Sequence, residues 1–203
     1  MKRFILVLAA ALFLGAASLS AADLVDGDYV VIRAPDQQPD YPVYRGLAVV
    51  IDGRTIRFPD SGAVVQLMDI DACELPQWAY NQDMKRPVPC GGFAKAWLKR
   101  LIGQTPVACH VATIAPDGMP LAYCFRGKSD LGLRMLAKGW ARVATPEAQC
   151  PLYFSAQTKA QLAGYGMWKD RVLDMELWRD WAKDRTLARR PIADYDLIFA
   201  TLP

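Results

Sequence analysis

The sequence predicts an α+β fold in which a small closed β-barrel carries helices packed against it. Short β-rich runs are separated by strong turn signals, and a run of apolar residues with helical period follows the first three of them. The resulting order of elements, β-β-β-α-β-β-α-α, contains no βαβ alternation, so a parallel sheet with helices on both faces is not expected. A barrel of mostly antiparallel strands satisfies this order.

The first 22 residues have the composition of a bacterial secretory signal peptide. Lys2 and Arg3 form a basic start, residues 4–14 are almost wholly apolar, and small residues end at Ala22. We expect cleavage near Ala22 and a periplasmic or secreted mature chain. The alternative is an uncleaved anchor helix, which the short apolar run disfavours, and no later segment of the sequence predicts a transmembrane helix.

Composition divides the rest of the chain into three parts. Residues 23–45, rich in Pro, Asp and Gln, predict an extended N-terminal segment, residues 46–169 a barrel domain, and residues 170–203 a C-terminal helix and tail. Without the signal peptide, 22 basic residues face 21 acidic ones. Because a nucleic-acid partner usually leaves a basic footprint, we do not favour nucleic-acid binding.

The first strands and the first helix are predicted from turn signals and periodicity. Strands are expected over residues 47–51, 54–58 and 64–70. A long loop over residues 75–89 then leads to an amphipathic helix over residues 93–102, which ends at Gly103.

A hairpin follows, with strands over residues 107–113 and 121–125. Its turn, Ala115-Pro116-Asp117-Gly118, has Pro at the second position and Gly at the fourth, as a type I turn prefers. This centre places Cys109 opposite Cys124, although a bulge at the turn would shift the partner by one residue.

The five cysteines are expected to form disulfides because an exported chain meets an oxidising compartment. With Cys109 bridged to Cys124, Cys73 pairs with Cys90 and Cys150 is left over. The alternative is five reduced thiols. No Cys-x-x-Cys pair exists and the chain has one histidine, so a zinc site is not expected.

Three more helices complete the prediction. Asp130 is expected to open a short helix that ends before Gly139, and another helix is expected over residues 153–163. In the C-terminal part, Leu173, Leu177 and Trp181 recur every four residues and predict the apolar stripe of a last helix.

From about residue 46 to residue 168 the chain resembles the staphylococcal nuclease, or thermonuclease, family. The resemblance implies a five-stranded OB-type β-barrel with three helices. The order and spacing of its motifs carry it: Asp52-Gly53-x-Thr55, Leu67-x-x-Ile70-Asp71-x-x-Glu74, Cys90-Gly91, Leu121-Ala122, Asp130-Leu131, Gly139-Trp140-Ala141 and Gly166-Met167-Trp168.

The resemblance also implies a chemistry that this sequence has partly lost. The family cleaves phosphodiesters with one calcium ion, two arginines that bind the phosphoryl group and a glutamate proposed to activate water. Asp71 matches a calcium ligand and Glu74 the glutamate. A second calcium ligand is replaced by Arg54, and the two arginines are replaced by Gln66 and Met119.

We therefore expect an exported thermonuclease-like protein without calcium-dependent nuclease activity, which acts as a binding or structural module and needs no cofactor. The sequence does not identify its envelope or secreted partner. The Arg54 guanidinium is expected to take the place of the metal and pair with Asp71 and Glu74; the alternative is that Arg54 points into water.

The competing hypothesis is a divergent metal-dependent phosphodiesterase. Asp69 and Asp71 lie two residues apart in a predicted strand, so their side chains would share one face, with Glu74 just beyond. These three carboxylates would then hold calcium or another divalent cation.

Overall fold

A computed structural model describes residues 40–145 and 150–183 of the chain. The predicted signal peptide, most of the N-terminal segment and the end of the C-terminal tail lie outside the described residues. Among those that are described, no helix is both long and apolar enough to cross a membrane.

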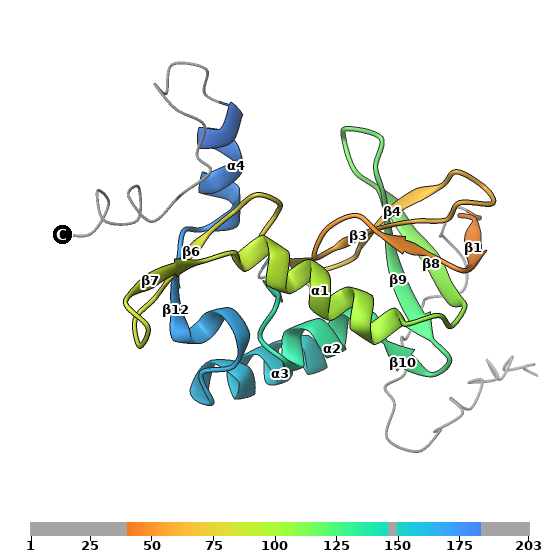
Figure 1. Ribbon diagram of the computed structural model, residues 1–203. Helices are drawn as coiled ribbons and strands as arrows, with labels where there is room; N and C mark the ends of the chain where they lie inside the picture. The colour runs from red at the N-terminus through yellow and green to blue at the C-terminus, as the bar shows by residue number, and fades with distance from the viewer. Residues whose placement is uncertain (1–39, 146–149, 184–203) are drawn as a thin grey trace, which may run out of the picture. The chain divides into compact units, whose positions relative to one another are not determined.

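The principal sheet is curled into a half-barrel and has the strand order β1-β8-β9-β4-β3-β2, with β10 beside β9 (Figure 1). Its pairs are antiparallel except β4 with β9. The seven strands are β1 Val43–Gly46, β2 Val49–Val50, β3 Thr55–Arg57, β4 Val64–Leu67, β8 Val107–Ile114, β9 Pro120–Arg126 and β10 Ser129–Asp130.

The α+β class is confirmed, whereas the count of five strands is not. One additional strand is β1, whose residues up to 45 were expected in the extended N-terminal segment; they pair instead with β8, where Val43 faces His110. Another is β10, which is only two residues long and leads directly into a helix. Its sequence therefore predicts the start of that helix rather than a strand.

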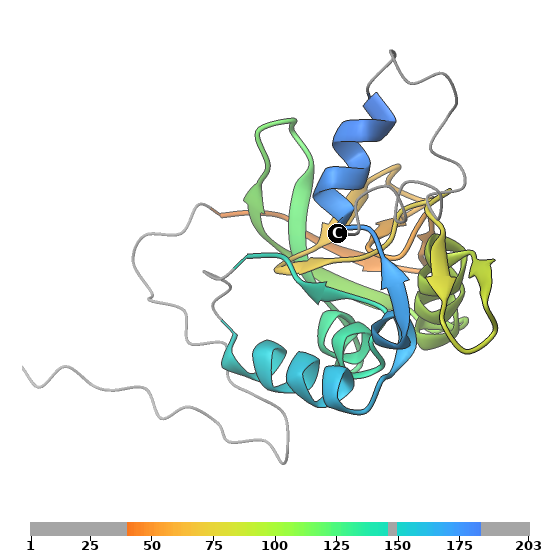
Figure 2. The same ribbon diagram turned by 90° about the vertical axis from the view of Figure 1, so that its left-hand side faces the viewer.

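The described ranges contain four α-helices and one short 3-10 helix. The helix α2 packs against both α1 and α3, and it also contacts β9 (Figure 2). The helices are α1 Cys90–Ile102, α2 Leu131–Ala137, α3 Pro151–Leu162, α4 Met175–Lys183 and the 3-10 helix Gly166–Lys169.

Local signals place the first three helices close to their predicted positions. The Asp130 side chain accepts a hydrogen bond from the Leu133 amide at 3.0 Å and so caps α2 as predicted. It also accepts from the buried Tyr153 hydroxyl of α3 at 2.8 Å. One carboxylate therefore fixes both the start of α2 and the position of α3.

The main core lies between the sheet and these three helices. Apolar residues from β3, β4, β9, α1 and α2 form it. The alternating apolar residues of the strands and the periodic apolar residues of the helices therefore lie in one core. Its most buried members include Ile56, Val65, Ala94, Leu98, Ala122, Met135 and Leu136.

Two smaller sheets were not predicted. The segment expected as a loop, residues 75–89, contains the hairpin β6 Ala79–Asn81 and β7 Arg86–Val88. The chain returns after α3 and adds β12 Asp170–Val172 to β6, so pairing with a distant segment turns this loop into a sheet. Separately, β5 Ile70–Asp71 pairs with β11 Arg142–Val143.

Both predicted disulfides are present. In the β8–β9 hairpin Cys109 pairs in register with Cys124, and the turn closes with the Gly118 amide donating to the Ala115 carbonyl at 2.9 Å. The bridge between Cys73 and Cys90 encloses the β6–β7 hairpin. Cys150 is a free thiol, half-buried at the start of α3.

The stripe predicted for the C-terminal helix is wrong in its details. The helix α4 begins only at Met175, so Leu173 is buried but precedes it. Leu177 is 38% exposed, and the buried side chains of α4 are Met175 and Trp178. Leu173 and Trp181 of the predicted stripe do pack together, with Trp178 in the place expected for Leu177, and Arg179, the next residue, reaches Asp71 and Glu74.

Candidate functional site

The carboxylates of Asp71 and Glu74, which we call the acidic corner, lie where the small β5–β11 sheet meets the start of α1. Asp71 is the last residue of β5 and faces Arg142 of β11. Its side chain is 5% exposed, whereas that of Glu74 is 25% exposed. A Cβ atom at Gly91 of α1 would lie 1.9 Å from the Glu74 carbonyl oxygen, so only glycine permits this close approach.

Arg54 reaches the acidic corner from a tight turn that precedes β3. The Asp52 carboxylate accepts hydrogen bonds from the Arg54 and Thr55 amides at 2.9 and 2.8 Å, which fixes the turn. The Arg54 Nη2 atom lies 3.2 Å from Glu74 Oε1, and its Nε atom 3.6 Å from Asp71 Oδ1. The predicted ion pairs are confirmed, and the alternative that Arg54 points into water is wrong.

Arg179 of α4 makes the tightest contact with the acidic corner. Its Nη1 and Nη2 atoms donate to Asp71 Oδ1 and Oδ2 at 3.1 and 2.9 Å, and Nη1 also donates to Glu74 Oε1 at 3.1 Å. Two parallel bonds between a guanidinium and one carboxylate are the strongest form of this ion pair.

A third arginine, Arg142, links the acidic corner to the base of α4. Its Nη2 atom lies 3.4 Å from Asp71 Oδ2 and 2.9 Å from Asp174 Oδ2. The other oxygen of Asp174 caps α4 by accepting from the Glu176 and Leu177 amides at 2.9 and 3.1 Å. Asp174 therefore holds the helix start and the β11 strand together.

The network as a whole is balanced in charge, since three arginines face the three carboxylates Asp71, Glu74 and Asp174. Burial alone lowers the pKa of Arg179, but the hydrogen bonds and charges of Asp71 and Glu74 outweigh it, so the pKa of Arg179 is raised above its usual value. The guanidinium is therefore charged at neutral pH.

Asp69, the third carboxylate of the competing hypothesis, does not share a face with Asp71. It has a positive φ of 61° in the turn between β4 and β5, so the extended alternation assumed from the sequence is wrong there. Its Oδ2 atom accepts from the Tyr123 hydroxyl at 2.6 Å. Burial, followed by the bond and charge of Asp69, raises the pKa of Tyr123.

Gln66 and Met119 lie in the sheet and its turn, and Gln66 pairs in register with Thr55 of β3, the residue after Arg54. Gln66 of β4 is in register with Leu121 of β9, and the Met119 amide donates to Asp117 at 3.0 Å in the β8–β9 turn. Neither makes a described hydrogen bond or ion pair with the acidic corner. At both positions the resemblance implies an arginine, and this chain has an uncharged side chain instead.

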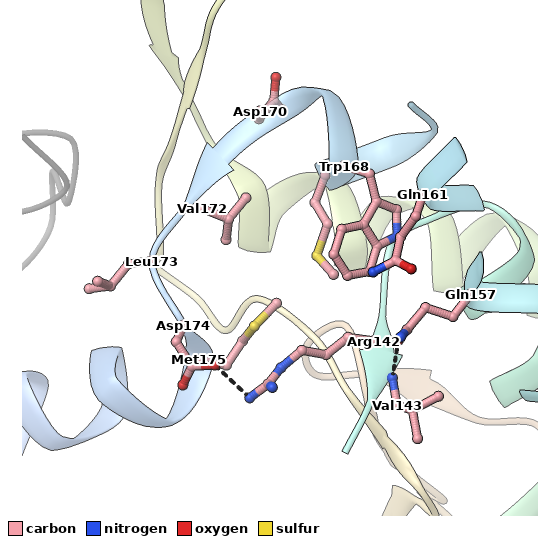
Figure 3. A pocket seen from close by; sticks show the side chains of 11 residues that line it. Arg142, Val143, Gln157, Gln161, Trp168, Asp170, Val172, Leu173, Asp174 and Met175 are labelled. Carbon is pink, nitrogen blue, oxygen red and sulfur yellow. Dashed lines mark hydrogen bonds and ion pairs between the residues drawn. The ribbon is translucent and has the colours of Figure 1, made fainter. Parts of the chain in front are cut away.

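A pocket of about 440 Å³ adjoins the network on the side of α3 and β12 (Figure 3). Arg142 and Asp174 are joined across it, and Gln157 accepts from the Val143 amide at 2.6 Å. The rest of its wall mixes apolar side chains, Met167, Val172, Leu173 and Met175 among them, with the polar Gln161 and Asp170. The Nε atom of Arg142 and the indole Nε1 of Trp168 are buried without a hydrogen-bond partner.

Sequence reasoning found Arg54 but missed Arg142 and Arg179. Arg54 stands inside a recognisable motif, where a carboxylate is expected. Arg179 lies 108 residues from Asp71, in a segment for which only a helical stripe was available. The one usable signal was that Arg179 directly follows Trp178, an apolar residue of the same predicted helix.

The groups in the acidic corner can bind cations, and the cations they hold are arginines. Throughout residues 40–145 and 150–183, no cluster of three or more His, Cys, Asp or Glu side chains is suited to a metal ion. The Arg54 and Arg179 guanidinium groups contact both carboxylates that the resemblance would assign to metal binding and catalysis.

Comparison with known proteins places the chain in a family. The family described as Staphylococcal nuclease homologue matches residues 64–170, more than half of the 203 residues, while no curated protein matches the chain. The match includes the acidic corner, β8, β9 and the first three helices. Arg54 and Arg179 lie on either side of it. The chain therefore belongs to the staphylococcal nuclease family.

Proposed function

We propose that the protein is an exported thermonuclease-like module that binds a partner and has no calcium-dependent nuclease activity. The observation that carries this proposal is the pairing of Arg54 and Arg179 with both carboxylates of the acidic corner. Two disulfides support export, because such bridges persist in oxidising compartments.

Electrostatics argue against calcium at this position. A unit charge about 4 Å from another contributes about 4 kcal/mol at an effective dielectric constant of about 20. Calcium needs six to eight oxygen ligands, whereas the acidic corner offers Asp71 and Glu74, both already bonded to arginines. The residues present do not fit the ion, so we derive no catalytic step through it.

The missing phosphate-binding groups point in the same direction. Gln66 and Met119 carry no charge with which to bind a phosphoryl group. In phosphoryl transfer a single arginine can contribute about 10³ to 10⁵ in rate, so an active site without both would be severely impaired even with a metal. A role in binding or structure is consistent with a retained fold and a lost reaction.

The direct test is cleavage of DNA and RNA by the full chain with calcium, magnesium or manganese, compared with Glu74→Gln. We expect no cleavage above a protein-free control in either case. Metal-dependent cleavage that the Glu74→Gln substitution abolishes would reject the proposal and establish a divergent phosphodiesterase. Cleavage that is equal in both proteins would indicate a contaminating nuclease, and repurification until it disappears would restore agreement with the proposal.

A further inference from the structure

We propose that the acidic corner is a binding site for a guanidinium group and that residues 170–183 carry its built-in ligand, Arg179. The inference deepens the proposed binding role and rests on it. The chemical class that the site recognises is an arginine side chain. Within the chain α4 supplies this side chain, and an arginine-bearing protein segment can replace α4 in that role.

The geometry matches a guanidinium rather than a cation in general. Arg179 uses two nitrogens on the two oxygens of Asp71, at 3.1 and 2.9 Å, and adds a bond to Glu74. A planar guanidinium can make these three directed bonds at once, whereas an ammonium group acts as a point charge. Arg54 is held by the same two carboxylates, so the acidic corner binds two guanidinium groups.

The receiving carboxylate is held in place by groups other than Arg179. Asp71 is almost wholly buried, and its Oδ1 atom also accepts from the Ala72 amide at 3.0 Å. Glu74 is positioned by its amide, which donates to Gln77 Oε1 at 3.3 Å. The site is therefore preorganised, and loss of Arg179 leaves a gap shaped for the group that filled it.

The segment that carries Arg179 is attached in a way that allows exchange. No residue of α4 belongs to the main core; Trp178 packs with Leu173 and Trp181 in a separate small cluster, and Met175 joins a second one. The Arg179 contacts tie α4 itself to the acidic corner, whereas the residues before it are held by the β12–β6 pairing, the Gln77–Leu173 hydrogen bond of 2.9 Å and the Arg142–Asp174 ion pair. An element with few apolar contacts is drawn from the low-stability part of a fold.

The first test is a calorimetric titration of the full-length Arg179→Ala variant with methylguanidinium at millimolar concentrations, far below those that denature proteins. We expect saturable binding that methylammonium, of equal charge, does not reproduce. Binding should be absent when Asp71→Asn is added, and absent in the wild type, where Arg179 fills the site. Arg57→Ala, which removes an exposed arginine of β3, is the matched control and should behave as the wild type.

The second readout is hydrogen exchange of the α4 amides, residues 175–183. Exchange should increase about tenfold in Arg179→Ala and not in Arg57→Ala, with the β8–β9 hairpin unchanged in both. If Arg179→Ala does not fold, Arg179→Lys serves instead, with intermediate α4 exchange expected because it keeps the charge but loses the paired bonds.

The inference is overturned if Arg179→Ala binds methylguanidinium no better than Arg57→Ala does, or if α4 exchange is the same in the variant and the wild type. Failure of the proposed function has a different signature, calcium binding or nucleic-acid cleavage by the wild type. The two can therefore fail separately.

Discussion

The Arg179 guanidinium donates to both carboxylate oxygens of Asp71, 108 residues earlier in the chain, at 3.1 and 2.9 Å. Through this contact the segment that follows the matched family domain closes over the acidic corner of that domain. Arg54 approaches the same carboxylates from the segment that precedes the match. The charge that a metal would supply is thus provided by the chain itself.

Asp71→Asn should be the most destabilising single change in the network. The Asp71 side chain is 5% exposed and pairs with three arginines, and breaking a buried ion pair by removing one partner costs about 3 to 5 kcal/mol. Urea denaturation would measure the free energy of unfolding. Asp180→Asn, on the exposed face of α4, is the control and should change it by less than about 0.5 kcal/mol. Equal effects would contradict the account.

Removal of both arginines should restore a cation site. In the double variant Arg54→Asp with Arg179→Ala, three carboxylates face one another and the one guanidinium of the network that remains, Arg142, is paired with Asp174, so terbium luminescence should report saturable cation binding. Each single variant should bind weakly or not at all, because Arg54 or Arg179 still contacts both Asp71 and Glu74. Strong binding by the wild type would show that the arginines do not exclude a cation.

The Cys73–Cys90 disulfide should stabilise the C-terminal segment through the β6–β7 hairpin that it encloses. Closing a loop of this length contributes about 3 kcal/mol if it acts through the unfolded chain. Replacing both cysteines by alanine should lower the unfolding free energy by about that amount and increase hydrogen exchange in β12, which pairs with β6. An increase confined to the β8–β9 hairpin would argue against this coupling.

The pH dependence of stability should contain a contribution from Asp170. Burial raises its pKa, and the hydrogen bond from Asn81 only partly offsets this. A carboxyl group whose pKa is raised by folding favours the folded state at low pH, and this contribution is lost as the pH rises through the raised pKa. In Asp170→Asn this decline should be absent, which denaturation across the acidic range would reveal. An unchanged decline would assign it to other groups.

What the sequence could predict was local or carried by motifs. The Cys109–Cys124 pair follows from the turn that centres its hairpin, and the cap of α2 from Asp130 just before the apolar run. The pairing of β12 with β6, and of Arg179 with Asp71, depends on how distant segments meet, which neither periodicity nor turn chemistry determines. Asp69 was misjudged because its positive φ interrupts the strand.

The central claim, that arginines fill the place of the metal, is tested most directly by calcium calorimetry on the wild-type chain. The account predicts no binding isotherm in the micromolar range, because Arg54 and Arg179 already satisfy Asp71 and Glu74. A clear micromolar isotherm that Asp71→Ala abolishes would contradict it.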